Sequence, residues 1–154
     1  MYFSYKAQNA SGDIVKGISL ASTREEAEIF LAQCQLTPLS VTQKKGTVKI
    51  PKKKISLLFR QFATLFRAGV PAGIIMDTVL EGEKHKGVIA VVQALKCDIQ
   101  MGTSLSEAFG KYNYIFDRFT IAMIGVGEEQ GNFADAFTRI ADQLESSQKL
   151  ASQI

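Results

Sequence analysis

The chain has 154 residues, which is enough for one ordinary domain or for one helical domain with a small appendage. Hydrophobic residues make up 46% of it and charged residues 21%, which excludes a disordered chain, and no apolar run approaches the ~18 residues of a membrane helix. The net charge is +3, but six of the 18 basic residues are lysines within residues 44–54, which contain no acid, so one short segment makes the chain basic.

Residues 1–43 predict a small mixed unit in the order strand, strand, helix, strand. The strands are expected at 2–7, 13–21 and 39–43, with turn chemistry between the first two. Ser22 or Thr23 is expected to cap the helix. The apolar face of that helix consists of Ala27, Phe30, Leu31 and Cys34. A unit of this size buries too little surface to be stable by itself.

Residues 44–53 predict a linker, because they combine lysines with Gly46 and Pro51 and lack helical periodicity. Three interpretations remain open for this segment. It can be a solvated tether, or it can be drawn to an anionic lipid leaflet, where each lysine contributes ~1 kcal/mol. Binding to nucleic acid is the third interpretation, and it is favoured less because no base-stacking aromatic side chains are interleaved with the lysines.

Residues 54–154 predict a mostly α fold, in which a six-helix antiparallel bundle follows the β-β-α-β unit, because apolar residues recur at helical spacing between short loops. The first helix has the apolar stripe Ile55, Leu58, Phe59, Phe62, Leu65 and Phe66. Residues 116–126 are apolar on nearly every side, so we expect this helix at the buried centre of the bundle. The last helix has no glycine or proline stop before Ile154, which suggests a piece of a longer protein.

The loop GVGEEQGNF, residues 125–133, has three glycines and two acids. It lacks the lysine and hydroxyl residue of a Walker phosphate loop, the spacing of a dinucleotide loop and the alternating acids of a calcium loop. We therefore expect a joint between two helices, in which Gly131 is left-handed and Asn132 caps the next helix. Two interpretations remain for Glu128: a satisfied structural carboxylate, or a polar contact or weak divalent-cation ligand at a subunit interface.

No residue pattern points to catalysis, a cofactor or a metal site, so we expect a protein that is not an enzyme. His85 is the single histidine and lies in a charged turn, where a solvated surface position is expected. Cys34 and Cys97 lack the C-x-x-C spacing of metal ligands. They lie far apart in the sequence and in different predicted units, and we expect two buried, reduced thiols, which fits a cytosolic protein.

Three segments carry a family pattern: FRQFATLFRAGVP at 59–71, GTSLSEAF at 102–109 and FDRFTIAMIGVGEEQGNF at 116–133. In order and spacing they resemble the motifs of the type II secretion system protein F family, which includes the inner-membrane platform proteins of type IV pili. The N-terminal unit is also similar to the leading segment of that family. Phe62 and Phe133 stand where leucine is usual, and Gln130 replaces a small hydroxyl residue, which indicates a divergent pilus-system member.

The resemblance implies a non-enzymatic domain on the cytoplasmic face of the bacterial inner membrane, in a full-length protein that is integral to the membrane. Such platforms contact a hexameric assembly ATPase, other inner-membrane assembly proteins and pilins. Their helical domain commonly pairs with itself or with its repeat, so we expect a homodimer or homo-oligomer. We expect the N-terminal unit to be the ATPase-docking module, because it is separate from the bundle. The competing interpretations are a soluble helical adaptor and a nucleic-acid-binding module that uses the lysines.

Nine residues are the expected interaction or structural positions. Arg60, Gln61 and Arg67 recur on one side of an otherwise apolar helix, so we expect them to contact a partner or another helix. Glu128 is the best interface candidate. The others are expected to set backbone geometry, and they are Gly69, Pro71, Gly102, Gly127 and Gly131.

Overall fold

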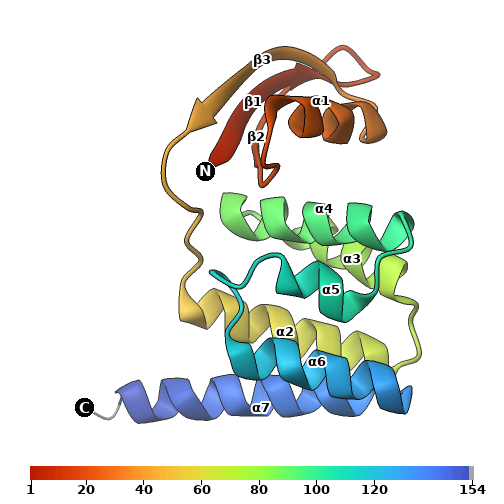
Figure 1. Ribbon diagram of the computed structural model, residues 1–154, viewed down its shortest axis with the longest axis vertical. Helices are drawn as coiled ribbons and strands as arrows, with labels where there is room; N and C mark the ends of the chain where they lie inside the picture. Colours follow the sequence, from red (N-terminus) through yellow and green to blue (C-terminus); the bar gives the residue numbers. More distant parts are fainter. Residues whose placement is uncertain (153–154) are drawn as a thin grey trace.

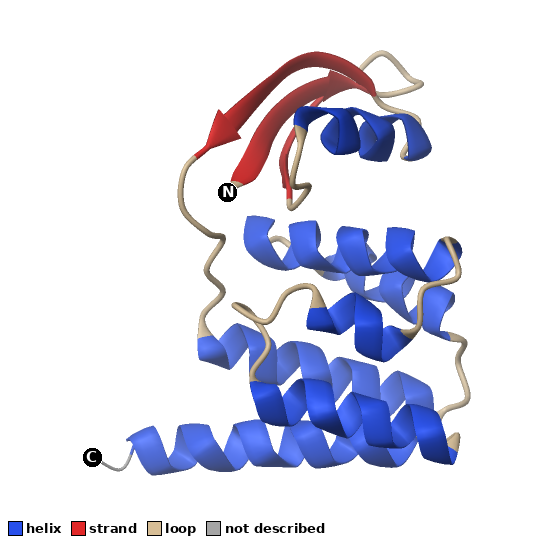
Figure 2. Ribbon diagram, in the orientation of Figure 1, coloured by secondary structure: helices blue, strands red, loops and turns tan. Residues whose placement is uncertain are grey.

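The computed structural model describes residues 1–152, which form three strands and seven helices (Figure 1). The elements are, in chain order, β1 (Tyr2–Gln8), β2 (Ile14–Ser19), α1 (Arg24–Gln33), β3 (Thr37–Lys44), α2 (Lys52–Arg67), α3 (Ala72–Gly82), α4 (Lys86–Gln100), α5 (Leu105–Gly110), α6 (Arg118–Gln130) and α7 (Phe133–Ser152). The expected fold class, a β-β-α-β unit followed by a helical bundle, is confirmed (Figure 2). The expected continuation of the last helix past Ile154 lies outside the described residues.

The N-terminal unit is an antiparallel sheet in the order β2-β1-β3, covered on one face by α1. Thr23 begins α1, because its side chain accepts a hydrogen bond from the backbone N–H of Glu26. The carboxylate of Glu26 in turn accepts from the backbone N–H of Ser22, which gives the reciprocal pattern of a capping box. The small core between sheet and helix consists of Phe3, Tyr5, Ala7, Ala27, Leu31 and Val41.

The N-terminal unit has a small core of its own, and it also packs directly on the bundle. Strand β2 contacts α4, and Leu20 belongs to the same buried cluster as the bundle core. The segment between β3 and α2 runs along one side of the molecule (Figure 1), and its Val48 is only 8% exposed. A Cβ on Gly87 of α4 would lie 3.0 Å from Val48, so the segment is anchored to the bundle in its middle.

The centre of the bundle is a group of phenylalanines around Phe59, which is fully buried. Its ring centroid lies 5.5 Å from that of Phe62, and 5.6 Å from that of Phe137 on α7. Phe109 and Phe116 complete the group at 5.9 and 5.7 Å. Aromatic pairs at these separations contribute beyond their buried area, so α2 and α7 are the core pair of the bundle.

Helix α6 is not the buried centre that its composition predicts. It buries Thr120, Ile124 and Gly127, but Phe119 is 44% exposed and Val126 41% exposed. The helix packs against α5 and α7, while α2 and its phenylalanines occupy the centre. An all-round apolar composition therefore does not decide which side of a helix is covered.

Two further expectations are corrected by the fold. His85 is not simply solvated: its Nδ1 accepts from the backbone N–H groups of Gly87 and Val88, so it caps the start of α4. Cys34 is exposed rather than buried, and Cys97 is partly exposed. The fold brings the two cysteine regions together, because the Cys97 thiol donates to Oε1 of Gln33, the residue before Cys34, at 2.5 Å.

Candidate functional site

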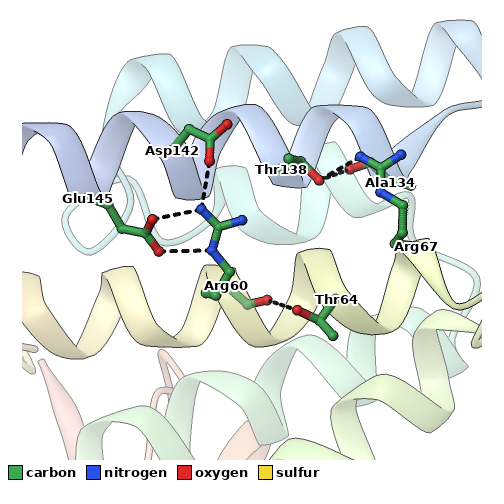
Figure 3. A network of polar contacts seen from close by, with 7 residues as sticks. All are labelled: Arg60, Thr64, Arg67, Ala134, Thr138, Asp142 and Glu145. Atoms are coloured by element: carbon green, nitrogen blue, oxygen red, sulfur yellow. Dashed lines mark hydrogen bonds and ion pairs between the residues drawn. The ribbon is translucent and has the colours of Figure 1, made fainter.

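The helices α2 and α7 are joined by polar contacts that we call the arginine seam, defined by Arg60, Arg67, Asp135, Thr138, Asp142 and Glu145. Figure 3 shows these residues except Asp135. Arg60 Nε donates to Glu145 Oε2 at 2.9 Å, and its Nη2 donates to Glu145 Oε1 at 2.7 Å. The same Nη2 donates to Asp142 Oδ1 at 2.6 Å. This two-pronged geometry is the strong form of an arginine–carboxylate pair, and it fixes the position of α7 along α2.

Arg67 repeats the contact two turns further along α2. Its Nη1 donates to Asp135 Oδ1 at 3.2 Å, and its Nη2 donates to Thr138 Oγ1 at 2.9 Å. The Thr138 hydroxyl donates onward to the Ala134 carbonyl at 2.6 Å (Figure 3). Because Arg60 meets the later part of α7 and Arg67 meets its start, the two helices run antiparallel.

The electrostatics of the seam follow from these bonds. The hydrogen bond from Arg60 lowers the pKa of Glu145 below its usual value, and the two carboxylates raise the pKa of Arg60. The side chains of Arg60 and Glu145 are 38% and 44% exposed, so solvent screens much of the attraction. The third residue expected on this side, Gln61, is exposed to solvent.

Glu128 holds α5 against α6. Its Oε1 accepts from the Ser106 hydroxyl at 2.9 Å, and its Oε2 accepts from the Ser106 backbone N–H at 3.2 Å. Both carboxylate oxygens are thus used within the chain, which is the structural-carboxylate interpretation of this residue. Within residues 1–152, no group of three or more His, Cys, Asp or Glu side chains is arranged to hold a metal ion.

Ser106 was missed by reasoning from the sequence. Its only sequence signal is its place two residues after Ser104, whose hydroxyl accepts from the Glu107 N–H and begins α5. The hydrogen bond from Ser106 to Glu128 joins residues 22 positions apart, so no local sequence pattern predicts it.

The five positions expected to set geometry lie at helix ends or close contacts. Gly131 ends α6 with φ +67°, a left-handed conformation that favours glycine. A Cβ on Gly127 would lie 2.6 Å from Ala136 Cβ of α7, so only glycine lets α6 and α7 approach this closely. Gly69 and Gly102 follow the ends of α2 and α4, and Pro71 immediately precedes α3.

The second charged surface is a group of lysines that we call the lysine edge, and its members are Lys44, Lys45, Lys49, Lys52, Lys53, Lys84 and Lys86. All seven are exposed, and none forms an ion pair with any residue that the structure describes. Lys54 differs, because it pairs with Glu83 at 3.5 Å. Lys44, Lys49 and Lys86 border a hollow of about 370 Å³, together with the hydroxyl residues Ser4 and Thr47.

A larger hollow, of about 760 Å³, lies between α1 and the α4 side of the bundle. Asp98, which lines it, is paired through Oδ1 with Lys111 at 2.9 Å, while its buried Oδ2 has no hydrogen-bond partner in the described structure. Burial and the nearby Asp98 raise the pKa of the Cys97 thiol, and burial together with Asp98 raises that of the Tyr112 hydroxyl. Both groups therefore stay protonated at neutral pH and are poor nucleophiles there.

The remaining candidate surface is apolar. Phe119, Ala122, Met123 and Val126 recur at helical spacing on α6; the first, second and fourth are exposed and Met123 is partly exposed. We call this group the α6 stripe. None of the helices within residues 1–152 combines the length and the apolar content that crossing a bilayer takes.

This chain is similar in sequence to known proteins along most of its length. Residues 58–154 match the family model described as Type II secretion system (T2SS), protein F. The Type II secretion system protein F of Vibrio cholerae is 27% identical, over 99% of this chain and 40% of its own length. The Type IV pilus assembly protein PilC of Myxococcus xanthus is also 27% identical, over 99% of this chain and 39% of its own length.

The Type II secretion system protein F of Xanthomonas campestris is likewise 27% identical, over 99% of this chain and 40% of its own length. The chain thus spans about two-fifths of the length of the curated relatives that it matches. Since the family model covers well over half of its residues, this chain belongs to the type II secretion system protein F family.

Proposed function

We propose that this region is a non-enzymatic platform domain of a type II secretion or type IV pilus assembly machine, at the cytoplasmic face of the bacterial inner membrane. Its work is mechanical, in that it carries displacement between an assembly ATPase and the subunits being assembled. The observation that carries the proposal is the α2–α7 pair, whose phenylalanine core and arginine seam join two long helices into one stiff element. Close-packed interiors have low compressibility and transmit strain.

We further propose that the N-terminal unit is the part that meets the ATPase. Ile14 on β2 and Leu39 on β3 are 58% and 52% exposed, so the sheet presents two large apolar side chains to solvent. Leu20 and Val48 fix the same unit to the bundle. A force on the sheet would therefore pass directly into α4 and from there into the rest of the helices.

Binding of the chain to the assembly ATPase of the same machine tests this proposal. Replacing Ile14 and Leu39 together by serine is expected to weaken the affinity about tenfold or more, measured by biolayer interferometry. The matched control replaces Leu57 and Ile74, which are 55% and 56% exposed on the bundle, and should change the affinity less than about twofold. An equal loss for both pairs, or a loss for the bundle pair alone, would refute docking through the sheet.

The α6 stripe is our proposed surface for self-association, because Phe119 and Val126 are large, exposed and seven residues apart on one face. Sedimentation velocity at increasing concentration tests this. Replacing both residues by serine should abolish concentration-dependent association, while the Leu57 and Ile74 pair should leave it intact. Association that survives the α6 changes would place the interface elsewhere.

A further inference from the structure

We propose that the lysine edge docks this region onto an anionic phospholipid surface, with a headgroup phosphate held in the hollow between Lys44, Lys49 and Lys86. The inference rests on the proposed function in one respect only, which is that this function places the chain close to a membrane. It goes beyond that function because it names which side of the domain faces the lipid and which residues hold it there.

The first support is that the lysines are presented on an anchored segment. Val48 is 8% exposed and packs beside Gly87 of α4, so the chain on either side of it is held against the bundle. The ion pair of Lys54 with Glu83 fixes the start of α2 in the same way. Binding by an ordered surface loses less conformational entropy than binding by a free tether.

The second support is that the positive charge is not neutralised within the chain. The only carboxylate paired at this edge, in the part of the chain that the structure describes, is Glu83. It is already occupied, because its Oε1 also accepts from the backbone N–H groups of Lys84 and His85. The seven exposed lysines therefore present a positive surface, while the rest of the chain is slightly acidic.

The third support is the chemistry of the hollow. Three lysines line it, one each from β3, the anchored segment and the first turn of α4, and Ser4 and Thr47 add hydroxyl groups to the lining. The N–H groups of Gly87 and Val88 at the start of α4 are already bonded to His85, so the lysines supply the attraction for an anion. Phosphate oxygens accept hydrogen bonds from both ammonium and hydroxyl groups.

A lipid surface fits this edge better than nucleic acid does. The five lysines of the edge between residues 44 and 53 have no interleaved aromatic side chains on which bases could stack. They are also all lysine, whose flexible stem and compact ammonium suit a field of headgroups, whereas planar arginine forks are the usual readers of nucleic acid. Each lysine near an anionic leaflet strengthens binding about fivefold.

Vesicle co-sedimentation of the chain tests the proposal. We expect binding to vesicles of equimolar phosphatidylglycerol and phosphatidylcholine and little binding to phosphatidylcholine alone. Raising the salt from about 0.05 M to about 0.5 M should release the protein, because exposed charges are screened within a few ångströms at the higher concentration. Equal binding to both vesicle types, or no dependence on salt, would overturn an electrostatic docking surface.

Substitution locates the surface. Replacing Lys44, Lys49 and Lys86 by glutamine should weaken binding about 100-fold, from three losses of about fivefold each. The control removes three positive charges away from the hollow, by replacing the exposed residues Arg24, Arg118 and Arg139 with glutamine, and should weaken binding less than about threefold. Equal weakening by both triple variants would show an effect of net charge alone and overturn the assigned surface. If either variant fails to fold by circular dichroism, the salt and lipid series on the unaltered chain decides the question.

Competition with two other anions distinguishes a lipid surface from nucleic acid and from free phosphate as the ligand. A single-stranded oligonucleotide that displaces the chain from the vesicles at equal phosphate concentration would favour nucleic acid and overturn the proposal. Displacement by millimolar inorganic phosphate would show a site for free phosphate instead of a lipid surface. The Lys44, Lys49 and Lys86 variant should still bind the ATPase, and the Ile14 and Leu39 variant should still bind vesicles, so failure of either proposal is distinguishable from failure of the other.

Discussion

The positively charged side chains at the start of α2 and those further along it differ in whether they have partners within the chain. Before the helix and in its first turn, Lys49, Lys52 and Lys53 are exposed and unpaired in the described part of the chain. Further along, Arg60 and Arg67 are bonded to carboxylate and hydroxyl groups of α7. The difference shows that a cation becomes structural where a second helix faces it, and stays available to a partner where none does.

The chemistry of the two side chains matches this division. A guanidinium can donate two parallel hydrogen bonds to one carboxylate, as Arg60 does to Glu145, and so it fixes one helix against another. A lysine has a compact, strongly hydrated charge on a flexible stem and fixes no such geometry. Even so, the phenylalanine core beneath the seam should dominate stability, because exposed ion pairs contribute only ~1 kcal/mol or less.

The largest expected effect tests that ranking. Replacing Phe59 by alanine should lower the free energy of unfolding by about 3–5 kcal/mol, because it removes a fully buried ring and leaves a cavity among four other phenylalanines. Urea denaturation measures the loss. The neighbouring Leu57, which is 55% exposed, is the control, and its change to alanine should cost less than about 0.5 kcal/mol. A smaller loss for Phe59 than for Arg60 would reverse the ranking.

An intermediate effect is expected at the seam. Replacing Arg60 by alanine should lower the free energy of unfolding by about 1 kcal/mol near pH 7, because Asp142 and Glu145 lose their shared partner while remaining partly solvated. Added salt should shrink the difference between the two proteins. Replacement by lysine should recover only part of the loss, since lysine cannot make the two-pronged contact.

The same variant has a defined dependence on pH. Arg60 lowers the pKa of folded Glu145, so the pair stabilises the fold above the unfolded carboxyl pKa of about 4.3 and loses this contribution as pH falls through the lower folded value. The stability difference between the natural chain and the Arg60 to alanine variant should therefore shrink in acid. A difference that stays constant between neutral and acidic pH would show that Glu145 is not the partner that matters.

The smallest effect is expected at the lysine edge. Replacing Lys44, Lys49 and Lys86 by glutamine should change the free energy of unfolding by less than about 0.5 kcal/mol, because none of them has an ion-pair partner in the described structure. Thermal denaturation checks this on the same protein that is used for vesicle binding. A large loss would mean that these lysines support the fold, and the contrast with the seam would disappear.

Much of the fold could be predicted because it depends on neighbours in sequence. The stripe from Ile55 to Phe66 repeats at helical spacing, and the structure buries Ile55, Leu58, Phe59 and Phe62. Thr23 and Ser104 begin helices through bonds to residues three positions away. Such patterns can be recognised in a single sequence, since turns, caps and amphipathic faces need only a few adjacent residues.

The candidate surfaces were less predictable, because they depend on contacts across long stretches of chain. Arg60 and Arg67 were expected to make polar contacts, but nothing local named Glu145 or Asp135 as their partners. Lys86 joins Lys44 and Lys49 only through the fold, which brings the start of α4 beside the segment before α2.

By itself, the order of residues settled the helical character of 54–152, the small sheet before it and the positions where glycine must end a helix. It did not settle which faces are covered: α6, apolar all round, leaves Phe119 and Val126 exposed, and the N-terminal unit packs on α4 through Leu20 and Val48. Local propensity and periodicity act within a few residues, whereas burial is a competition among all apolar faces for one shared interior.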